Sequence, residues 1–419
     1  MIFFLYQFLI FIIIIISPII LIIRFIKKKE DKSKFIEKFC VLNRNNTKGN
    51  LIWFHCASVG ELMSVIPLIY ELEKNRKIEK ILVTTTTLSS SKIFKNFKFK
   101  KTIHQFFPID FCYFTSKFIN HWKPKLAIFV DSEIWPGMFR EIKKKSIPLI
   151  LMNARITKKT FKRWSYIKRF SQEVFSNINI AYPQNIETVR YLKFFKVKKL
   201  KKIGNLKFTE TKDLKIKKFS NSFRSLLKKR LIMCATSTHP SEEIFVGKAH
   251  NILKKKFPNL MTIIIPRHIH RVDDIEKDLN DINLKIIKRT SNQKIQKNTD
   301  VYIVDTFGET KRFLKVSNLA FMGGSIISHG GQNPIEPARF GLNIIHGPNI
   351  DNFNDIYKFF LTRNISYKVT NLENFVKVCE NLFNKKNIKK INLKKIGNRI
   401  LQKSTKEINK MLVYEIEKT

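Results

Sequence analysis

The sequence predicts an α/β protein made of two doubly wound Rossmann-like domains that face a cleft, with an apolar helix at the N-terminus. The 419 residues are too many for one ordinary hydrophobic core and enough for two domains of common size. From residue 51 onward, short apolar runs alternate with amphipathic stretches of helical length. Continuous apolar runs are typical of parallel strands that helices cover on both faces, so each half is expected to hold a parallel sheet.

The N-terminal segment MIFFLYQFLIFIIIIISPIILII (1–23) is long enough to cross a bilayer, which takes about twenty apolar residues. It lacks the basic start and the small residues that mark a cleaved signal peptide. A basic cluster follows it at Arg24, Lys27, Lys28, Lys29, Lys32 and Lys34. By the positive-inside rule, the sequence predicts a single-pass anchor with the body of the protein on the cytoplasmic side. The alternative is an interfacial helix or a buried hairpin that breaks at Pro18.

The apolar runs place the expected strands. In the first half they lie at 51–58, 81–87, 104–110, 126–133, 147–153 and 179–184. In the second half they lie at 231–237, 261–267, 301–306, 319–325 and 342–348. The predicted boundaries are an anchor at 1–24, a first domain at 25–210, a linker at 211–230 and a second domain at 231–419.

The polar residues of interest follow these strands, which is where open α/β sheets bind ligands. Two such domains predict a nucleotide on one and an acceptor on the other, as in a transferase. No GxGxxG follows the first strand and no GxxxxGK[ST] occurs, so a dinucleotide cofactor and a P-loop are not expected.

The charge and the cysteines narrow the class of protein. The chain has 79 Lys and Arg against 33 Asp and Glu, a net charge of +46. This excess predicts an anionic partner, namely nucleic acid, acidic lipid or acidic sugar, unless it is a compositional bias spread over the surface. The five cysteines form no CxxC pair, so neither a disulfide framework nor a zinc site is indicated.

Three segments of the first half contain candidate catalytic residues. In HCASVGEL, Ser58 and Glu61 have the spacing of a capping box, and Glu61 is also placed to act as a general base at the end of a strand. In VDSEIWPGM, Asp131 and Glu133 are expected on one side of an extended strand end, and the pair also resembles part of a metal site. Lys207 in GNLKF lies next to apolar residues, although one lysine among so many carries little signal.

The second half contains candidate anion-binding residues. Ser237 and Thr238 precede a predicted helix, as helix N-caps or as phosphate ligands. Arg267 can bind a phosphate or a base, whereas a zinc site at its histidine neighbours, including His268, has no further clear ligand. The pair Phe307 and Gly308 allows backbone groups to approach a flat ring.

The segment HGGQNPIEP (329–337) combines glycines that allow close approach with two prolines that suit a helix start. Asn333 is expected as the N-cap and Pro334 as the first helical residue. Glu336 would then lie in the first turn, where it can accept hydrogen bonds from a ribose diol. An ordinary capped helix is the alternative interpretation.

Eight motifs in register resemble one family, the 3-deoxy-D-manno-octulosonic acid (Kdo) transferases of lipid A assembly. The motifs are HCASVGE (55–61), DSEIWPG (131–137), NAR (153–155), GNLKF (204–208), STH (237–239), PRH (266–268), DTFGE (305–309) and GGSIISHGGQNPIEP (323–337). The resemblance runs from the anchor to beyond residue 356 and implies a GT-B fold. It also implies inverting transfer of Kdo from CMP-Kdo to a hydroxyl of a tetraacylated lipid A precursor, at the cytoplasmic face of the inner membrane.

The resemblance implies a role for each matching position. Glu61 matches the general base, Asp131 an acid that stabilises the transition state with Glu133 beside it, and Lys207 a basic residue of similar role. The positions that match CMP-contacting segments are Arg267, His268, Phe307, Gly308, Glu309, Asn333, Pro334, Ile335 and Glu336. The sequence departs from the family where Asp131 replaces a usual Glu, Gly137 a usual Asn and Gln332 a usual His, and where Pro240 stands in a usually acidic helix start.

Neither a metal nor a cofactor is expected, because CMP has a single phosphate that basic side chains and a helix N-terminus can hold. The expected partners are CMP-Kdo, the lipid A precursor and inner-membrane lipids, with no nucleic acid. Two alternatives remain open: another lipid-linked GT-B glycosyltransferase that uses a UDP-sugar, or a non-enzymatic basic protein that binds membrane or nucleic acid. An aromatic-basic RNA-binding motif is missing from the sequence, which disfavours nucleic-acid binding.

Overall fold

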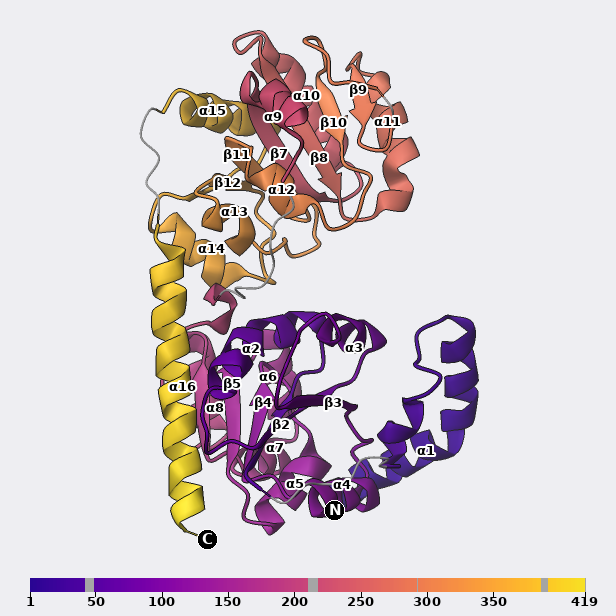
Figure 1. Cartoon of the computed structure of the whole chain (residues 1–419), viewed down its shortest axis with the longest axis vertical. Coiled ribbons are helices and arrows are strands. Elements are labelled where there is room, and N and C mark those ends of the chain that lie inside the picture. Colours follow the sequence, from indigo (N-terminus) through magenta and orange to yellow (C-terminus); the bar gives the residue numbers. More distant parts are fainter. Residues whose placement is uncertain (42–48, 210–217, 292, 386–390, 419) are drawn as a thin grey trace. The chain divides into compact units, whose positions relative to one another are not determined.

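The computed structural model describes residues 1–41, 49–209, 218–291, 293–385 and 391–418. The chain divides into two compact units (Figure 1). The first unit comprises Met1–Lys212 together with Lys394–Thr419, and the second comprises Asp213–Leu393. Each unit is built on one sheet of parallel strands, which confirms the predicted fold class.

The first unit has a six-stranded sheet in the order β3-β2-β1-β4-β5-β6, in which the strand order reverses between β1 and β4. Its strands are β1 (Leu51–His55), β2 (Lys80–Thr85), β3 (Thr102–Phe106), β4 (Leu126–Val130), β5 (Leu149–Ala154) and β6 (Ile180–Pro183). Ile52 of β1 is paired with Ile81 on one side and with Leu126 on the other. Every residue of β1, β4 and β5 is buried, which explains why these strands read as continuous apolar runs.

Helices accompany this sheet. They are α1 (Ile2–Ile26), α2 (Val59–Leu72), α3 (Leu88–Phe94), α4 (Cys112–Trp122), α5 (Pro136–Lys144), α6 (Lys158–Ser165), α7 (Lys168–Phe175), α8 (Ile186–Phe194) and α16 (Leu393–Glu417), with 3-10 helices η1 (Phe35–Phe39) and η2 (Leu206–Phe208). The core between sheet and helices is aromatic, with Trp53 tilted against Phe118 and edge to face with Phe129. Such ring pairs add to the stabilisation that burial of their area provides.

The second unit has a seven-stranded sheet in the order β13-β12-β11-β7-β8-β10-β9. Its strands are β7 (Leu231–Thr238), β8 (Leu260–Pro266), β9 (Ile286–Lys288), β10 (Val301–Ile303), β11 (Leu319–Met322), β12 (Asn343–His346) and β13 (Ser366–Lys368). Its helices are α9 (Asn221–Lys228), α10 (Glu242–Lys254), α11 (Val272–Asn280), α12 (Thr310–Leu314), α13 (Ile335–Arg339), α14 (Asn354–Leu361) and α15 (Leu372–Phe383), with η3 (Ile269–Arg271). The two edge strands, β9 and β13, were not predicted, because each has three residues with only one buried.

The domain boundaries differ from the predicted ones in two places. Residues 394–419, predicted in the second domain, belong to the first unit, where Glu407 of α16 accepts a hydrogen bond from Tyr182 Oη (3.2 Å). The predicted linker 211–230 includes α9, whose Leu227 is buried in the core of the second unit, while residues 210–217 lie outside the described residues. Long-range packing decides both boundaries, and composition alone does not reveal it.

The N-terminal apolar helix is present as α1. Within the described residues it is the one helix that is long and apolar enough to cross a membrane. Its buried side chains are Gln7, Ile10 and Ser17, and its other side chains are partly or fully exposed.

Candidate active site

Glu61 lies in the first turn of α2, directly after β1 and next to the point where the strand order reverses. Its carboxylate accepts hydrogen bonds from Ala57 N (2.7 Å) and Ser58 Oγ (3.0 Å). It also accepts from Ser58 N (3.4 Å) while Glu61 N donates to Ser58 Oγ, so the capping box is complete. Burial, with smaller contributions from Glu133 and Asp131, raises the pKa of Glu61 to about 7. A carboxylate with a pKa near neutrality can both cap the helix and accept a proton.

Asp131 follows β4 on the other side of the same reversal point. The prediction of an extended strand end is wrong, because the strand stops at Val130 and Asp131 has a left-handed backbone with φ 56°. This turn places the carboxylate beside three partners, since Oδ1 accepts from Asn153 Nδ2 (2.6 Å) and Gln184 Nε2 (3.0 Å) and Oδ2 lies 3.4 Å from Lys207 Nζ. The structure therefore brings together two of the predicted catalytic residues, Asp131 and Lys207.

Glu133 is held by a different set of groups. Its Oε2 accepts a hydrogen bond from Trp135 Nε1 (2.8 Å) and lies 3.3 Å from His55 Nε2. His55 Nδ1 in turn contacts Thr84 Oγ1 (3.0 Å), and burial, which outweighs the interaction with the Glu133 carboxylate, lowers the pKa of this histidine. The carboxylate of Glu133 thus binds the rings of Trp135 and His55, and it contributes negative charge near Glu61.

Three amide side chains that the sequence prediction did not name as site residues hold this arrangement. Asn205 Nδ2 donates to Gln184 Oε1 (3.0 Å), and the first backbone N–H of η2 (Leu206–Phe208) donates to Asn153 Oδ1 (2.9 Å). Because Asn153 and Gln184 also donate to Asp131, the network fixes the lysine of η2 against the ends of β4, β5 and β6. The sequence could have indicated these site residues by their position, because Asn153 and Gln184 stand at the ends of predicted strands.

Ser237 and Thr238 end β7 in the second unit, and neither caps α10 as the sequence allowed. Ser241 occupies the N-cap position without a side-chain hydrogen bond, and Ser237 has a left-handed backbone with φ 55°. Among the described residues, the buried Oγ1 of Thr238 has no hydrogen-bond partner.

Glu242, which the sequence prediction missed, organises the loops around the end of β7. Its side chain is fully buried at the start of α10. Oε2 accepts from His239 N (3.0 Å) and Gly324 N (2.6 Å), and Oε1 accepts from Ser325 N and Ile326 N (both 3.0 Å). One carboxylate thus satisfies four backbone donors, three of them buried, and joins two loops.

The glycines of the second loop allow this close packing. A Cβ on Gly323 would lie 2.2 Å from the carbonyl oxygen of Ser237. Gly324 and Gly331 have φ values of 66° and 73°, and Gly331 N donates to Gly324 O (2.7 Å). The loop therefore folds back on itself against the end of β7.

A histidine cluster lies at the same end of the sheet. The ring of His239 is 4.0 Å from that of His329 and 6.1 Å from that of His268, and its Nε2 lies 3.2 Å from Gln332 Nε2. Burial, followed by the charges of the neighbouring histidines, lowers the pKa of His239 to about 4, so this ring is neutral. Arg267, which is exposed, begins the loop after β8 and supplies a positive charge beside the cluster.

The residues of the predicted segment 307–309 differ in their exposure to solvent. Phe307 is 85% exposed and Gly308 has φ 81°, with open space around the position of a Cβ. Glu309 instead forms ion pairs with Arg289 (3.0 Å) and Arg312. Burial raises the pKa of Glu309, but the hydrogen bond from Arg289 and other favourable contacts leave it below the ordinary value. The free groups of this segment are thus the aromatic ring and the glycine backbone.

The helix after HGGQNPIEP begins one residue later than predicted. Pro334 is at the N-cap position, Ile335 is the first residue of α13, and Asn333 Oδ1 accepts from Ile335 N (3.1 Å). Asn333 thus still fixes the turn, although it lies before the cap. Glu336 is in the first turn as predicted, and its Oε1 lies 3.6 Å from Lys311 Nζ of α12.

Among the residues that the structure describes, no group of three or more His, Cys, Asp or Glu side chains is arranged to hold a metal ion. The carboxylates of Asp131 and Glu133 have amide, lysine, indole and imidazole partners instead. The expectation of metal-free chemistry stays a prediction.

Gly323→Ala is expected to destabilise the second unit by about 2 kcal/mol, because the methyl group would overlap backbone atoms of residue 237 that cannot move aside. Urea denaturation of the purified chain measures the change. Gly60→Ala is the matched control, because its nearest non-adjacent atom is Ser58 Oγ at 4.0 Å. Equal unfolding midpoints for the two variants would show that the loop relaxes around the added methyl group.

Comparisons with known proteins agree with this arrangement. Residues 33–210 match the family model of 3-deoxy-D-manno-octulosonic-acid transferase (kdotransferase). The 3-deoxy-D-manno-octulosonic acid transferase of Rickettsia typhi is 35% identical over 342 residues, which cover 82% of this chain and 74% of that protein. The transferase of the same name from Haemophilus influenzae is 33% identical over 314 residues, 74% of this chain and 73% of that protein.

A solved glycosyltransferase from Rickettsia africae shares the two-domain fold, with a TM-score of 0.58 over 87% of this chain and 99% of that chain at 11% identity. The two parallel sheets and this likeness identify the fold as GT-B. The matched family region contains all the residues discussed above for the first unit from Ala57 to Lys207. With relatives above 30% identity along most of its length, the chain belongs to the 3-deoxy-D-manno-octulosonic acid (Kdo) transferase family of glycosyltransferases.

Proposed function

We propose that this transferase moves Kdo from CMP-Kdo to a hydroxyl of a tetraacylated lipid A precursor, with inversion at the transferred carbon and with Glu61 as the general base. The observation that carries the proposal is the carboxylate of Glu61, whose pKa is raised to about 7 at the reversal point of the first sheet. At that pKa the group is a competent base near neutral pH and is not consumed by an ion pair.

The reaction follows from the residues around this base. The acceptor hydroxyl attacks the ketosidic carbon of Kdo from the face opposite CMP, so that the new C–O bond forms as the bond to the phosphate oxygen breaks. The hydroxyl proton passes to Glu61. Asp131 and Lys207, 3.4 Å apart and fixed by two amides, supply opposite charges that can stabilise charge developing on the sugar and on the leaving phosphate.

The second unit supplies the groups that a nucleoside monophosphate requires. Arg267 and His268 are exposed at the end of β8. The backbone of Phe307 and Gly308 is open to a flat base, and Glu336 can accept from the ribose diol. In this proposal no metal or cofactor takes part, because the single phosphate is bound by cationic side chains.

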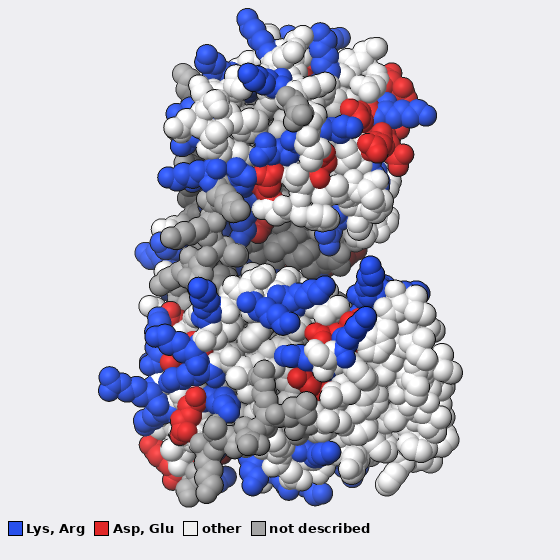
Figure 2. All heavy atoms as spheres, turned by 45° about the vertical axis from the view of Figure 1, so that its right-hand side comes forward, with Lys and Arg blue, Asp and Glu red and all other residues white. Residues whose placement is uncertain are grey.

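The proposed location is the cytoplasmic face of the inner membrane, with α1 as the anchor. The net charge of +46 fits the anionic membrane surface, the phosphorylated acceptor and the acidic sugar. Figure 2 shows Lys and Arg side chains spread over the visible faces of both units, so part of this excess is a general surface property. Nucleic acid is not proposed as a partner.

Incubation with CMP-Kdo and the lipid A precursor, followed by mass spectrometry of the lipid, tests the proposal directly. A mass increase of one or more Kdo units is the expected result. An unchanged lipid, together with a higher melting temperature in UDP than in CMP, would favour the alternative of a UDP-sugar transferase. An unchanged lipid with no stabilisation by either nucleotide would favour a non-enzymatic membrane protein.

Lys207→Met is expected to lower the rate of Kdo transfer by about a hundredfold, because it removes one preorganised charge while it keeps the apolar stem. The Asp131 carboxylate would keep its two amide donors, so folding is expected to persist. Lys202→Met is the matched control, because this exposed lysine lies in the same segment. Equal rates for the two variants in the mass-spectrometric assay would contradict the proposed role of Lys207.

A further inference from the structure

The first end of α1 is bound to the body of the first unit through polar contacts. Tyr6 Oη donates to Asp110 Oδ2 (2.6 Å), and Gln7 Nε2 donates to Asp110 O (3.1 Å). Gln7 Oε1 in turn accepts from Cys112 N, the first residue of α4 (2.8 Å). The guanidinium group of Arg140 lies over the ring of Phe3, 4.3 Å from its centroid. The N-terminal turns of the apolar helix therefore pack on α4 and α5.

These contacts are built into the domain. The carboxylate of Asp110 is itself fixed, because it accepts from Gly137 N (2.8 Å) and Met138 N (2.6 Å) in the first turn of α5. Gln7 is a polar residue inside an otherwise apolar segment, and its side chain is only 9% exposed. An amide in hydrocarbon without partners costs several kcal/mol, so Gln7 favours the docked position over a position among lipid tails.

The second end of α1 returns to the same region. Arg24 Nε pairs with Glu30 Oε2 (2.8 Å), and Glu30 Oε1 pairs with Lys38 Nζ (2.7 Å). Ile109 N donates to Lys38 O (2.9 Å). One end of the helix is therefore connected to Asp110. The other end is connected, through Glu30 and η1, to Ile109, which precedes Asp110 in the sequence.

The length of α1 bears on whether the helix crosses the membrane. Its 25 residues would extend about 37 Å as a straight helix, and a membrane span would place the two ends on opposite sides of a hydrocarbon core of about 30 Å. Here the first end contacts the domain directly and the second is linked to it through Glu30 and Lys38. Figure 1 shows α1 leaving the side of α4 and then turning before the chain returns. Pro18 lies within the helix, where a proline removes a hydrogen bond and favours a bend.

Between the two bound ends, α1 is an apolar surface. Figure 2 shows the surface at its lower right, where α1 lies, without Lys, Arg, Asp or Glu over most of its area. The large apolar side chains exposed there are Ile2, Phe4, Leu5, Phe8, Leu9, Phe11, Ile13, Ile15, Ile16, Ile19, Ile20, Ile22, Ile23 and Ile26. An exposed apolar surface of this composition marks an interaction site, and its lack of charge suits the lipid of a membrane.

We propose that α1 dips into one leaflet of the membrane from the side of the catalytic body and returns to that side without crossing the bilayer. The occupant of this surface is the lipid of a single leaflet. The N-terminus and the C-terminus would then lie on the same face of the membrane, unlike in the single-pass arrangement that hydropathy and flanking charge predict.

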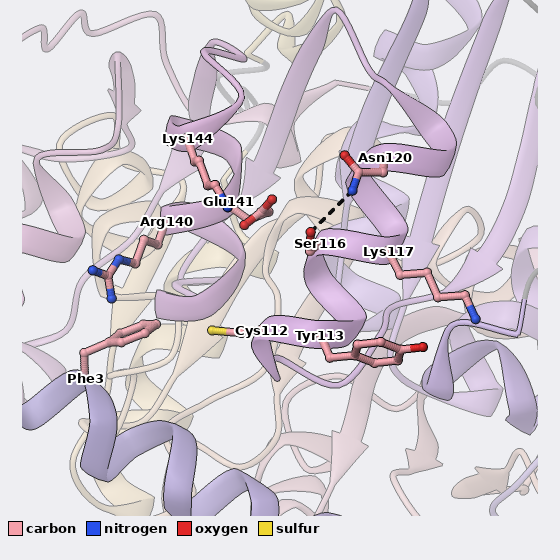
Figure 3. Close-up of a pocket in the computed structure, with 9 residues that line it drawn as sticks. All are labelled: Phe3, Cys112, Tyr113, Ser116, Lys117, Asn120, Arg140, Glu141 and Lys144. Carbon is pink, nitrogen blue, oxygen red and sulfur yellow. Dashed lines mark hydrogen bonds between the residues drawn. The ribbon is translucent and has the colours of Figure 1, made fainter.

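A pocket beside the docked end would lie at the level of the lipid headgroups. It has a volume of about 850 Å³ and is formed by α4, α5 and the start of α1 (Figure 3). Its three cations are Lys117, Arg140 and Lys144, against a single acid, Glu141. This charge, adjacent to a surface that enters lipid, assigns the pocket to the headgroup of an anionic phospholipid.

Protease accessibility of terminal tags tests the topology in full-length protein. One tag with a cleavage site is placed before residue 1 and another after residue 419, and protease is added to spheroplasts and to inside-out vesicles. We expect both tags to be cleaved in inside-out vesicles and neither in spheroplasts. Cleavage of the N-terminal tag in spheroplasts, with the C-terminal tag protected, would overturn the proposal and establish a spanning helix.

Binding of dihexanoyl phosphatidylglycerol to the detergent-solubilised full chain tests the pocket, with dihexanoyl phosphatidylcholine as the neutral comparison. Arg140→Gln/Lys144→Gln is expected to weaken phosphatidylglycerol binding at least about fivefold, which corresponds to one well-placed basic residue. The control pair Lys143→Gln/Lys145→Gln changes exposed lysines of the same segment that do not line the pocket, and is expected to have no effect. Equal weakening by both pairs, or equal binding of both lipids, would overturn the assignment.

Discussion

Glu61→Gln is expected to lower the rate of Kdo transfer by about 10²- to 10⁴-fold, because the variant cannot accept the proton of the acceptor hydroxyl. The glutamine keeps one oxygen that can accept from Ala57 N, and its amide N–H can donate to Ser58 Oγ, so the helix cap and the fold are expected to persist. Glu71→Gln is the matched control, because Glu71 lies on the same helix and pairs only with Lys74 on the surface in the described structure. A Glu61→Gln rate near that of the unmodified protein would show that another group is the base.

The pH dependence of the rate follows from the same group. A base must be deprotonated, and burial raises the pKa of Glu61 to about 7, so the rate is expected to rise with pH up to about 7 and then to level off. The residual rate of Glu61→Gln is expected to lack this step. A rise centred near the ordinary carboxylate pKa of 4.5 would contradict the buried environment of this side chain.

The stability of the protein should change in the opposite direction to its activity. Between the ordinary pKa of 4.5 and the folded value of about 7, the folded state holds a proton on Glu61 that the unfolded state has released. Its contribution to the free energy of unfolding therefore falls as pH rises through this window. Glu61→Gln removes this effect, so its melting temperature at pH 8 should equal or exceed that of the unmodified protein. This outcome, with activity lost, would separate catalysis from folding.

Glu242→Ala is expected to destabilise the second unit by about 3 kcal/mol or more, because four backbone donors, three of them buried, lose their acceptor. The donors belong to the turn after β7 and to the glycine loop, which contribute to the proposed nucleotide site. We therefore also expect KM for CMP-Kdo to rise more than kcat falls. Urea denaturation measures the first effect and steady-state kinetics the second.

The control for this variant is Asp278→Ala, which removes an exposed carboxylate from α11 of the same unit. It is expected to change neither the unfolding midpoint nor KM. If Glu242→Ala matched this control, water would have replaced the carboxylate at all four donors, and Glu242 would not position the loop.

The sequence predicted the strands because their signal is local. In β1, β4 and β5 every residue is buried, so each strand is visible as an uninterrupted apolar run. The edge strands β9 and β13 have one buried residue each and lack such a run. The capping box of Ser58 and Glu61 was also visible, because all its groups lie within four residues of one another.

The arrangement of the proposed catalytic residues depends on contacts between residues that are distant in the sequence. Asp131 and Lys207 meet only because Asn153 and Gln184, at the ends of two other strands, bind the same carboxylate. The left-handed turn at Asp131 has no signature in its neighbours, so the prediction of an extended end was wrong. Glu242 reads as an ordinary acid at a helix start, and its role appears only when a loop more than eighty residues away is packed beside it.

By itself, the sequence determined two parallel α/β domains, an apolar N-terminal segment and the order of motifs that marks the Kdo transferases, since these depend on local composition and spacing. Only the tertiary structure decided the pKa of Glu61, because burial and two neighbouring carboxylates from the loop after β4 raise it. It also decided where α1 binds. The hydrophobicity of the segment shows only that it is long enough to enter lipid, and does not reveal that Tyr6 and Gln7 bind Asp110. Both depend on which groups folding brings within a few ångströms.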